Sequence, residues 1–388
     1  MAEDIDKHVL RRYDCSQKLG KGACGIVWKA QDKKSKDTVA LKKIFDAFQN
    51  ATDAQRTYRE IMFLQEMKGH EHIITLLNVM KADNDRDIYL VFEHMETDLH
   101  AVIRADILEE VHRQYIVYQT LKALWYMHSA QLVHRDMKPS NLLLNSECLV
   151  KVADFGLARS LLDDGGVDEG GPSDNVLTDY VATRWYRAPE LLCLSHSYGA
   201  AVDLWSTGCI LAEMILRAPL MAGNDYLNQL QLIIQTLGTP TDAEMATLEN
   251  EHARQYVRRL PEQKAKSWEE VMPHATPAAR ALLRKLLVFD QAKRLTATLP
   301  LAPHAKCGAP GRPHWSGQWS VRTSLATTEV ALGQLAVRGQ EKLVAIKPCG
   351  KGLLLETLRY ADEVRKGQAF FSEIDESKPA KELLDLAT

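Results

Sequence analysis

The sequence predicts an α+β fold of two lobes, β-rich then α-rich, followed by an extra C-terminal α/β fragment. Residues 13–95 alternate apolar and polar side chains with the period of strands and hold one helical stretch. Residues 107–298 contain several stretches with helical spacing. A stretch with four prolines and three glycines at 299–320 then separates these two regions from a further periodic segment. Together these observations predict a small sheet lobe, a larger helical lobe, a linker and a fragment.

Length and composition exclude several classes of protein. A chain of 388 residues is long enough for two or three compact units, each with a core. Its net charge of −3 does not suggest a globally basic nucleic-acid binder. No apolar run approaches the roughly 18 residues that span a bilayer, and residues 1–14 are too polar for a secretory signal. The seven cysteines lack CxxC spacing, so we expect a reducing cytoplasmic or nuclear location and no zinc site.

The small lobe is expected to contain strands at 13–19, 26–32 and 37–44, with a glycine-rich turn at 20–25. Thr52 to Gln55 matches a capping box and predicts the start of a helix. Tyr58, Ile61 and Leu64 then fall at helical spacing. Residues 73–80 and 87–95 return to the pattern of strands.

The larger lobe is expected to contain helices at 111–131, 202–216, 227–238 and 277–289, with a short strand pair within 142–153. The resulting organisation has four parts. They are an N-terminal extension (1–12), the two lobes (13–298), a Pro/Gly-rich linker (299–320) and a C-terminal segment (321–388).

The glycines Gly20, Gly22 and Gly25 form a G-x-G-x-x-G motif that Val27 follows. Dinucleotide-binding folds share this spacing, but a helix follows their glycines, whereas a strand is predicted here. The backbone amides of such a hairpin can approach phosphates closely because no Cβ blocks them. A plain hairpin turn is the other interpretation.

Lys42 closes an apolar strand seventeen residues after Gly25. Glu60, on the predicted helix, can pair with it and hold the ammonium group toward anionic oxygens. A surface lysine with only its aliphatic stem buried is the alternative.

The stretch HRDMKPSN runs from His134 to Asn141, and DFG begins at Asp154. The strand pair between them can present Asn141 and Asp154 to one metal ion, which leaves Asp136 to orient a hydroxyl nucleophile. Phosphoryl transfer needs this combination of a metal clamp, a cationic phosphate contact and a positioned acceptor.

These motifs, with A-P-E at 188–190, occur in the order of a eukaryotic protein kinase, which the chain resembles. The resemblance implies a two-lobed protein kinase fold with ATP and Mg²⁺ as cofactors. Lys42, held by Glu60, would contact the phosphates. Asp136 would be the catalytic base, and Lys138 would touch the transferring phosphate. Asn141 and Asp154 would bind magnesium.

The resemblance also implies a nucleotide site. Glu93 to Met95 would form the hinge that binds adenine, and Phe92 would lie behind the base or serve only the core. The full set of expected nucleotide contacts is Leu19, Gly20, Lys21, Gly22, Ala23, Cys24, Gly25, Ile26, Val27, Ala40, Lys42, Glu93, Met95, Leu143 and Asp154.

Thr178 and Tyr180 bracket Asp179 between DFG and APE, where T-x-Y is the mark of mitogen-activated protein kinases. Residues 45–61 and 84–104 most resemble the atypical branch of the extracellular-signal-regulated kinases. The resemblance implies activation by phosphorylation of both hydroxyls. The expected receivers are Arg59, Arg135 and Arg159 for phospho-Thr178, and Arg184 and Arg187 for phospho-Tyr180. An unmodified loop held by ordinary salt bridges is the alternative.

The expected activity is transfer of the γ-phosphate of ATP to Ser or Thr of protein substrates, with proline following. Activation is expected from an upstream dual-specificity kinase or from autophosphorylation. The sequence departs from the family at Cys24, the tip of the glycine turn, where relatives often carry an aromatic residue. It departs again after Arg294, which is expected to pair with Glu190, because the linker replaces the last helix. A kinase-fold binding module that does not catalyse is therefore the main rival.

Residues 325–374 resemble part of the bacterial Ku family, which binds DNA ends, and 358–365 carry the most specific match. Residues 321–388 hold ten basic and ten acidic side chains, so they lack the surplus charge that drives phosphate-backbone binding. A fusion without DNA function is favoured over an interaction module, and DNA-end binding is not expected. The residues predict strands at 335–339 and 342–348, and then either a strand followed by a helix or a helix alone within 352–366.

Overall fold

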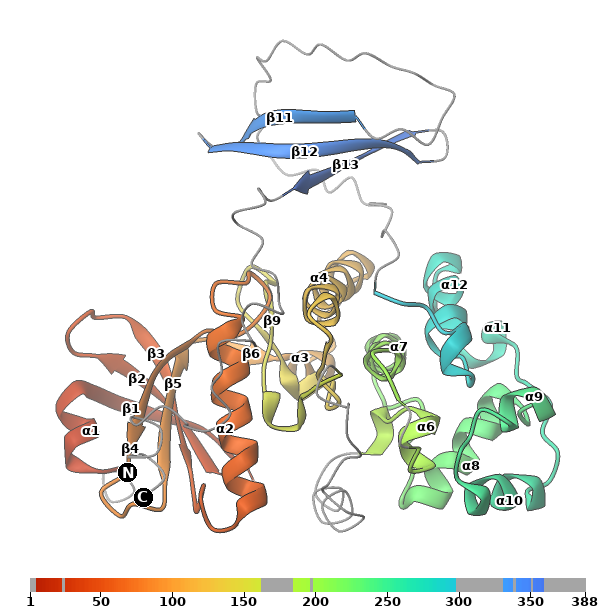
Figure 1. The fold of residues 1–388 in the computed structure, drawn as a ribbon, viewed down its shortest axis with the longest axis horizontal. Helices are drawn as coiled ribbons and strands as arrows, with labels where there is room; N and C mark the ends of the chain where they lie inside the picture. Colours follow the sequence, from red (N-terminus) through yellow and green to blue (C-terminus); the bar gives the residue numbers. More distant parts are fainter. Residues whose placement is uncertain are drawn as a thin grey trace, which may run out of the picture. The chain divides into compact units, whose positions relative to one another are not determined.

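The computed structural model describes residues 5–22, 25–161, 184–195 and 198–297, and the backbone of three strands at 331–337, 340–349 and 352–358. The chain divides into two compact units, Met1–Leu301 and Ala302–Thr388 (Figure 1). None of the helices in the described ranges combines the length and apolar character that crossing a bilayer requires.

The small lobe is built on a five-stranded antiparallel sheet in the order β1-β2-β3-β5-β4. The structure therefore confirms the strands expected from the alternating pattern. The elements are α1 (Lys7–Arg12), β1 (Tyr13–Gly22), β2 (Gly25–Asp32), β3 (Thr38–Ile44), α2 (Ala51–Glu66), β4 (Leu76–Lys81) and β5 (Ile88–Glu93).

Alternation along β5 divides the lobe into two apolar layers. Tyr89 and Val91 face the layer that contains Val9 of α1. Leu90 and Phe92 face the layer that contains Leu64 of α2. The two helices therefore cover opposite faces of the sheet, because successive strand residues point to opposite sides.

The helix α1 belongs to the small-lobe core, although its residues were expected to form an extension. Val9 is fully buried and Ile5 is 6% exposed, and both lie in the layer that holds Trp28. The amide of Asp6 also donates to the Tyr89 hydroxyl at 3.1 Å. A six-residue helix is too short to show a helical period in the sequence.

The start of α2 differs from the prediction. Its N-cap is Asn50, whose side chain accepts a hydrogen bond from the Asp53 amide at 2.9 Å. The capping box expected at Thr52 is wrong, because that residue already lies inside the helix. Tyr58 is 47% exposed, whereas Glu60 and Leu64 are buried. A buried glutamate on the inner face explains why the apolar pattern alone misplaced that face.

The larger lobe is mainly helical, and the four helices predicted within 107–298 are confirmed. They correspond to α4 (Glu110–Ser129), α7 (Ala201–Leu216), α8 (Tyr226–Leu237) and α12 (Pro277–Leu286). The described residues of this lobe also contain the shorter α-helices α3 (Leu99–Arg104), α6 (Pro189–Leu192), α9 (Asp242–Met245), α10 (Glu251–Arg259) and α11 (Trp268–Val271).

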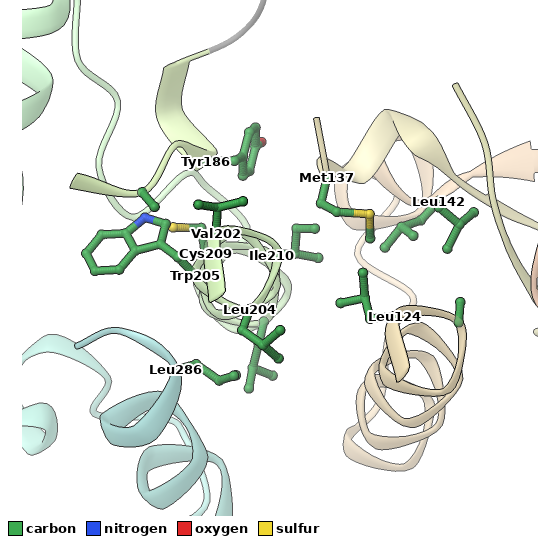
Figure 2. Packing of buried hydrophobic residues seen from close by; sticks show 14 of the residues in the cluster. Leu124, Met137, Leu142, Tyr186, Val202, Leu204, Trp205, Cys209, Ile210 and Leu286 are labelled. Atoms are coloured by element: carbon green, nitrogen blue, oxygen red, sulfur yellow. The ribbon is translucent and has the colours of Figure 1, made fainter. Parts of the chain in front are cut away.

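The buried helix α7 forms the centre of this lobe. Figure 2 shows Ile210 of α7 pointing toward Met137, and Leu204 pointing toward Leu286 of α12. Met137 is 1% exposed and stands between Asp136 and Lys138. The apolar core thus anchors the segment that carries the candidate catalytic residues.

Short strands complete the arrangement. A three-stranded sheet has the order β6-β8-β9, and β7 pairs with β10. The bounds are β6 (Thr97–Asp98), β7 (Leu132–Val133), β8 (Leu142–Leu144), β9 (Val150–Val152) and β10 (Arg159–Ser160). The strand pair predicted within 142–153 is therefore confirmed.

The second unit contains an antiparallel sheet in the order β11-β12-β13. Its strands are β11 (Ala331–Val337), β12 (Gln340–Cys349) and β13 (Gly352–Leu358). The predicted strand pair is confirmed, and the segment that begins at Gly352 is a strand. Most of the distinctive stretch 358–365 lies outside the described residues.

Candidate active site

The glycine-rich turn joins β1 to β2, where Gly20 pairs with Val27 and Gly22 pairs with Gly25. A Cβ added to Gly25 would lie 1.9 Å from the Lys43 carbonyl oxygen, so β2 and β3 approach each other too closely for a side chain there. The predicted glycine hairpin is therefore present, while Ala23 and Cys24 at its tip lie outside the described residues.

The other expected nucleotide contacts fall on both faces of the sheet. Leu19 and Lys21 are exposed on β1. Ala40 and Lys42 share one face of β3, since they are two residues apart in a strand. Ile26 instead packs in the layer beneath α1, so its side chain faces away from the layer that Ala40 contacts.

Lys42 is held by an ion pair from the helix α2. Its Nζ lies 2.9 Å from Oε1 of Glu60, and the two side chains are 23% and 6% exposed. The buried carboxylate fixes the ammonium group at the sheet surface. This pairing excludes the interpretation of Lys42 as an unpartnered surface lysine.

The hairpin of β8 and β9 brings Asn141 next to Asp154. The Ala153 amide donates to the Asn141 carbonyl at 2.9 Å, directly before Asp154. Asp154 has a left-handed backbone with φ of 64°. Burial alone would raise the pKa of its carboxyl, but the charges of Lys42 and Arg56 outweigh that effect and hold the pKa below its usual value. Lys42 and Asp154 therefore influence each other electrostatically.

Hydrogen bonds fix one oxygen of the Asp136 carboxylate. Its Oδ2 lies 2.6 Å from Nζ of Lys138 and accepts a hydrogen bond from Nδ2 of Asn141 at 3.1 Å. The same Nδ2 also donates to the Asp136 carbonyl at 2.8 Å. Among the described residues, these contacts leave Oδ1 of Asp136 and Oδ1 of Asn141 as the atoms that can meet ligands. One side of the carboxylate is held rigid, and the other can accept a hydroxyl.

Asp203 on α7 supports this loop and was missed by the sequence analysis. Its carboxylate accepts hydrogen bonds from the amides of His134 at 2.9 Å and Arg135 at 2.8 Å, and lies 2.8 Å from Nε2 of His128. Arg135 has a positive φ of 68°, a conformation that needs such support. The available signal was an acidic residue in a mostly apolar helix, because burial of a carboxylate is costly unless it is paired.

The DFG segment packs inward. Phe155 is fully buried, and its ring meets that of His134 edge to face at a centroid distance of 5.0 Å. A Cβ added to Gly156 would lie 2.7 Å from Nε of Arg56, so the guanidinium of α2 lies directly against this glycine. Arg56 was not among the predicted site residues, although it stands one helical turn before Glu60.

The expected hinge follows β5. Glu93 pairs with Val39 at the end of the strand, and Leu143 pairs with Asp98 in the small sheet that follows Met95. Phe92 is 9% exposed within the core, which agrees with its role as a core residue. The contacts of Glu93, Met95 and Leu143 with adenine stay predictions.

The predicted phosphate receivers have different surroundings. Arg59 lies on α2 and is partly exposed. The Arg135 guanidinium stacks on the ring of Tyr198 at 5.1 Å, and Nη1 of Arg159 donates to the Ala158 carbonyl at 2.9 Å. Thr178 and Tyr180 lie outside the described residues, so the convergence of these arginines on a phosphate stays a prediction.

Arg184 and Arg187 share Tyr226. Both guanidinium groups lie over its ring, at 5.2 Å and 5.8 Å. Nη1 of Arg187 also donates to its hydroxyl at 2.7 Å. The two arginines are therefore adjacent, as a shared anion would require.

The predicted pair of Arg294 and Glu190 is present. Nη1 and Nη2 of Arg294 lie 2.7 Å and 3.0 Å from the two carboxylate oxygens, in a buried bidentate arrangement. The guanidinium also lies 5.1 Å from the ring centre of Trp205. This pair fixes the end of the segment that runs from DFG to APE.

Comparison with known proteins agrees with this geometry. Residues 13–303 match the family described as "Protein kinase domain", and residues 321–386 match "Ku70/Ku80 beta-barrel domain". The chain is 63% identical over 301 residues to "Extracellular signal-regulated kinase 2" of Dictyostelium discoideum, a match that covers 78% of this chain and 81% of that protein.

Two further relatives are "Mitogen-activated protein kinase 15" of Xenopus laevis and "Extracellular signal-regulated kinase 7" of Drosophila melanogaster. They are 53% and 45% identical, in each case over 76% of this chain. The chain spans only 50% and 32% of their respective lengths.

A protein kinase domain implies the use of ATP, and these three relatives are mitogen-activated or extracellular-signal-regulated kinases. The chain therefore belongs to the protein kinase family, within the mitogen-activated, extracellular-signal-regulated group of Ser/Thr protein kinases.

Proposed function

We propose that this chain transfers the γ-phosphate of ATP to Ser or Thr side chains of protein substrates, preferably those followed by proline. The main observation behind this proposal is that hydrogen bonds and an ion pair connect four residues of the candidate site, namely Asp136, Lys138, Asn141 and Asp154. Each member has the chemistry that its proposed role requires, and the hairpin of β8 and β9 links them. The Lys42–Glu60 pair adds the cationic phosphate contact.

Asp136 orients the substrate hydroxyl and receives its proton as the new O–P bond forms and the bond between the γ-phosphorus and the bridging oxygen of ADP breaks. Because Lys138 and Asn141 hold Oδ2, the free Oδ1 has a defined direction. Lys138 stands within the same hydrogen-bonded group and offsets negative charge on the transferring phosphate. Lys42 does the same for the α- and β-phosphates.

Asn141 and Asp154 fit a magnesium site by their donor chemistry. A carboxylate and an amide oxygen are hard ligands of the kind that Mg²⁺ prefers. Asn141 uses its Nδ2 for Asp136, which leaves Oδ1 as a ligand. Magnesium, when bound, offsets charge on the phosphate oxygens. The lowered pKa of Asp154 keeps its carboxyl ionised for this purpose.

The test is phosphate transfer by the purified chain with Mg-ATP and a peptide that contains Ser-Pro or Thr-Pro. Asp136→Asn and Lys42→Met should each reduce transfer by at least about 100-fold, because each removes a group that acts in the transition state. Asp242→Asn, an exposed carboxylate on α9, is the matched control. Retained turnover in either site variant would contradict the roles given.

A kinase-fold binding module that does not catalyse would give a different result. It would show a higher melting temperature with Mg-ATP, because ligands that bind the native state stabilise it, but no labelled peptide. Melting curves and a radiolabel assay on the same preparation therefore separate this alternative from an active kinase.

Activation is proposed to require phosphate on Thr178 and Tyr180, added by an upstream dual-specificity kinase or by the chain itself. Thr178→Ala and Tyr180→Phe should each lower kcat/KM by about tenfold or more, since each removes a group that would form charge-assisted hydrogen bonds with arginines. Mass mapping of both residues after incubation with Mg-ATP reports self-activation. Full activity of the double variant would overturn the switch.

A further inference from the structure

A partly buried ion pair joins the proposed hinge to the strand that leads to Asp154. Nζ of Lys151 in β9 lies 3.0 Å from Oε1 of Glu93 at the end of β5, and the side chains are 10% and 29% exposed. Lys151 stands three residues before Asp154. A charged side chain at a buried strand position is costly, so the pair needs an explanation beyond chance.

The same carboxylate reaches a third element. Oε1 of Glu93 accepts a hydrogen bond from the Thr75 amide at 2.7 Å, and the Glu93 amide donates to the Thr75 carbonyl at 3.1 Å. Thr75 directly precedes β4. One glutamate therefore ties β9 to two strands of the small-lobe sheet.

Backbone contacts continue this junction along β9. The Val152 amide donates to the His72 carbonyl at 2.9 Å, and the Ile74 amide donates to the Val152 carbonyl at 3.0 Å. A ring nitrogen of His72 lies 3.2 Å from the Val150 carbonyl. The segment between α2 and β4 thus lies along β9, with the Lys151–Glu93 pair beside it.

No second acid in the described part of the chain forms an ion pair with Lys151. The imidazoles of His70 and His72 are near enough for the charge of Lys151 to affect their pKa values. Burial first, with nearby cations that include Lys151, lowers the pKa of His70 to about 4 and also lowers the pKa of His72. Both rings are neutral at pH 7, and Glu93 supplies the balancing charge.

We propose that Lys151 and Glu93 are positioning residues, which hold the hinge backbone at a fixed distance from β9, the strand that leads to Asp154. The proposal rests on the proposed function, since that function assigns adenine to the hinge and magnesium to Asp154. Neither side chain needs to touch the nucleotide. The pair acts by fixing the adenine end of the nucleotide site relative to the magnesium end.

A loosened junction weakens nucleotide binding more than it slows chemistry. Adenine is held equally in the ground state and in the transition state, so loss of its alignment raises KM for ATP with little change in kcat. The protein substrate binds elsewhere, so its KM should not change.

The test uses Lys151→Met in the full chain. The KM for Mg-ATP and the Kd of a fluorescent ADP analogue should both rise about fivefold, within the range that coupling between contacting residues produces. We expect kcat and the peptide KM to stay within about twofold of wild type, as for loss of uniform binding. Lys151→Arg retains the charge and should restore nucleotide affinity.

The matched control is Lys293→Met. Nζ of Lys293 lies 3.3 Å from Oδ2 of Asp290 in the larger lobe, and neither residue contributes to the junction along β9, so its loss should leave nucleotide affinity unchanged. Pairing is tested by Lys151→Gln combined with Glu93→Gln. This double variant leaves no unpaired buried charge, so it can replace Lys151→Met in the test if that variant fails to fold.

Unchanged nucleotide Kd in the folded Lys151→Met or double variant would overturn the proposal. So would an equal loss of kcat and peptide affinity that Lys151→Arg does not restore, because that result indicates a general structural role. Failure of the wild-type chain to bind nucleotide or to transfer phosphate would instead count against the proposed function.

Discussion

Asp203 determines the shape of the catalytic loop from a position more than sixty residues further along the chain. It is fully buried and accepts the amides of His134 and Arg135. The left-handed Arg135 backbone costs on the order of 1–3 kcal/mol, so it persists only where the surroundings enforce it. The reactive carboxylate of Asp136 follows directly, and its direction depends on this support.

Acid titration provides a test of this role. Burial would raise the pKa of Asp203, but the His128 hydrogen bond and charge hold it below the usual 3.8. A lowered carboxyl pKa contributes stability above pH 4, and that contribution is lost as the pH falls through the folded value. Asp203→Asn should therefore lower the free energy of unfolding by about 3 kcal/mol at pH 7 and less at pH 3, because it breaks a buried pair.

Denaturant unfolding between pH 3 and pH 7 measures this difference. Asp32, Asp87 and Asp154 also have lowered pKa values, so wild type and variant share a background loss of stability in acid. Asp242→Asn controls for removal of a surface carboxylate. A constant gap between wild type and Asp203→Asn across this pH range would show that the ionised form of Asp203 contributes nothing.

The single residues that sequence reasoning identified share one property. Asp136, Asn141 and Asp154 were recognisable because their chemistry and spacing match a reaction. Asp203 and Arg56 were missed because their partners lie far away in the sequence. Their roles exist only in contacts, with the amides of one loop and with Gly156.

At the scale of elements, the longer helices were predictable and the shorter ones were not. The helices α4, α7, α8 and α12 contain 20, 16, 12 and 10 residues, and each was predicted from the sequence. The helix α1 was missed because six residues carry no period. The start of α2 was misplaced by two residues, since Asn50 and Thr52 both belong to the residue types that favour caps.

The helix α1 gives a prediction at this scale. Deletion of residues 1–12 should expose Trp28, which is 2% exposed, together with Tyr89 beneath Val9. Loss of that cover should cost about 3 kcal/mol or more, as burial of two to three large apolar side chains implies. We expect a lower melting temperature and a red-shifted tryptophan emission.

Two point variants refine this test. Val9→Ala should cost about 1–2 kcal/mol, since it leaves a cavity against the sheet. Lys7→Ala, at an exposed position of the same helix, should cost little. Equal stability of wild type and the deleted chain would mean that α1 does not contribute to the small-lobe core.

At the scale of the whole molecule, the kinase site and the second unit are separable in the sequence. Every described site residue and every partner named for it lies within Met1–Leu301. Proline and glycine accumulate at 299–320 in the sequence, so a linker between the two periodic regions stays a prediction. The Ku resemblance covers residues 321–386, whose composition balances ten basic against ten acidic side chains.

Removal of the second unit tests whether the kinase depends on it. A chain of residues 1–301 should transfer phosphate with a kcat/KM within about twofold of the full chain, because it keeps every described site residue and every partner named for one. A blunt DNA duplex at about 0.1 M salt should not be shifted by either chain, since a neutral segment releases few counterions. Peptide phosphorylation and a gel shift on matched preparations measure both. A loss of activity that added residues 302–388 restore would show that the second unit supports the kinase. A duplex shifted only by the full chain would instead assign that unit a DNA-binding role.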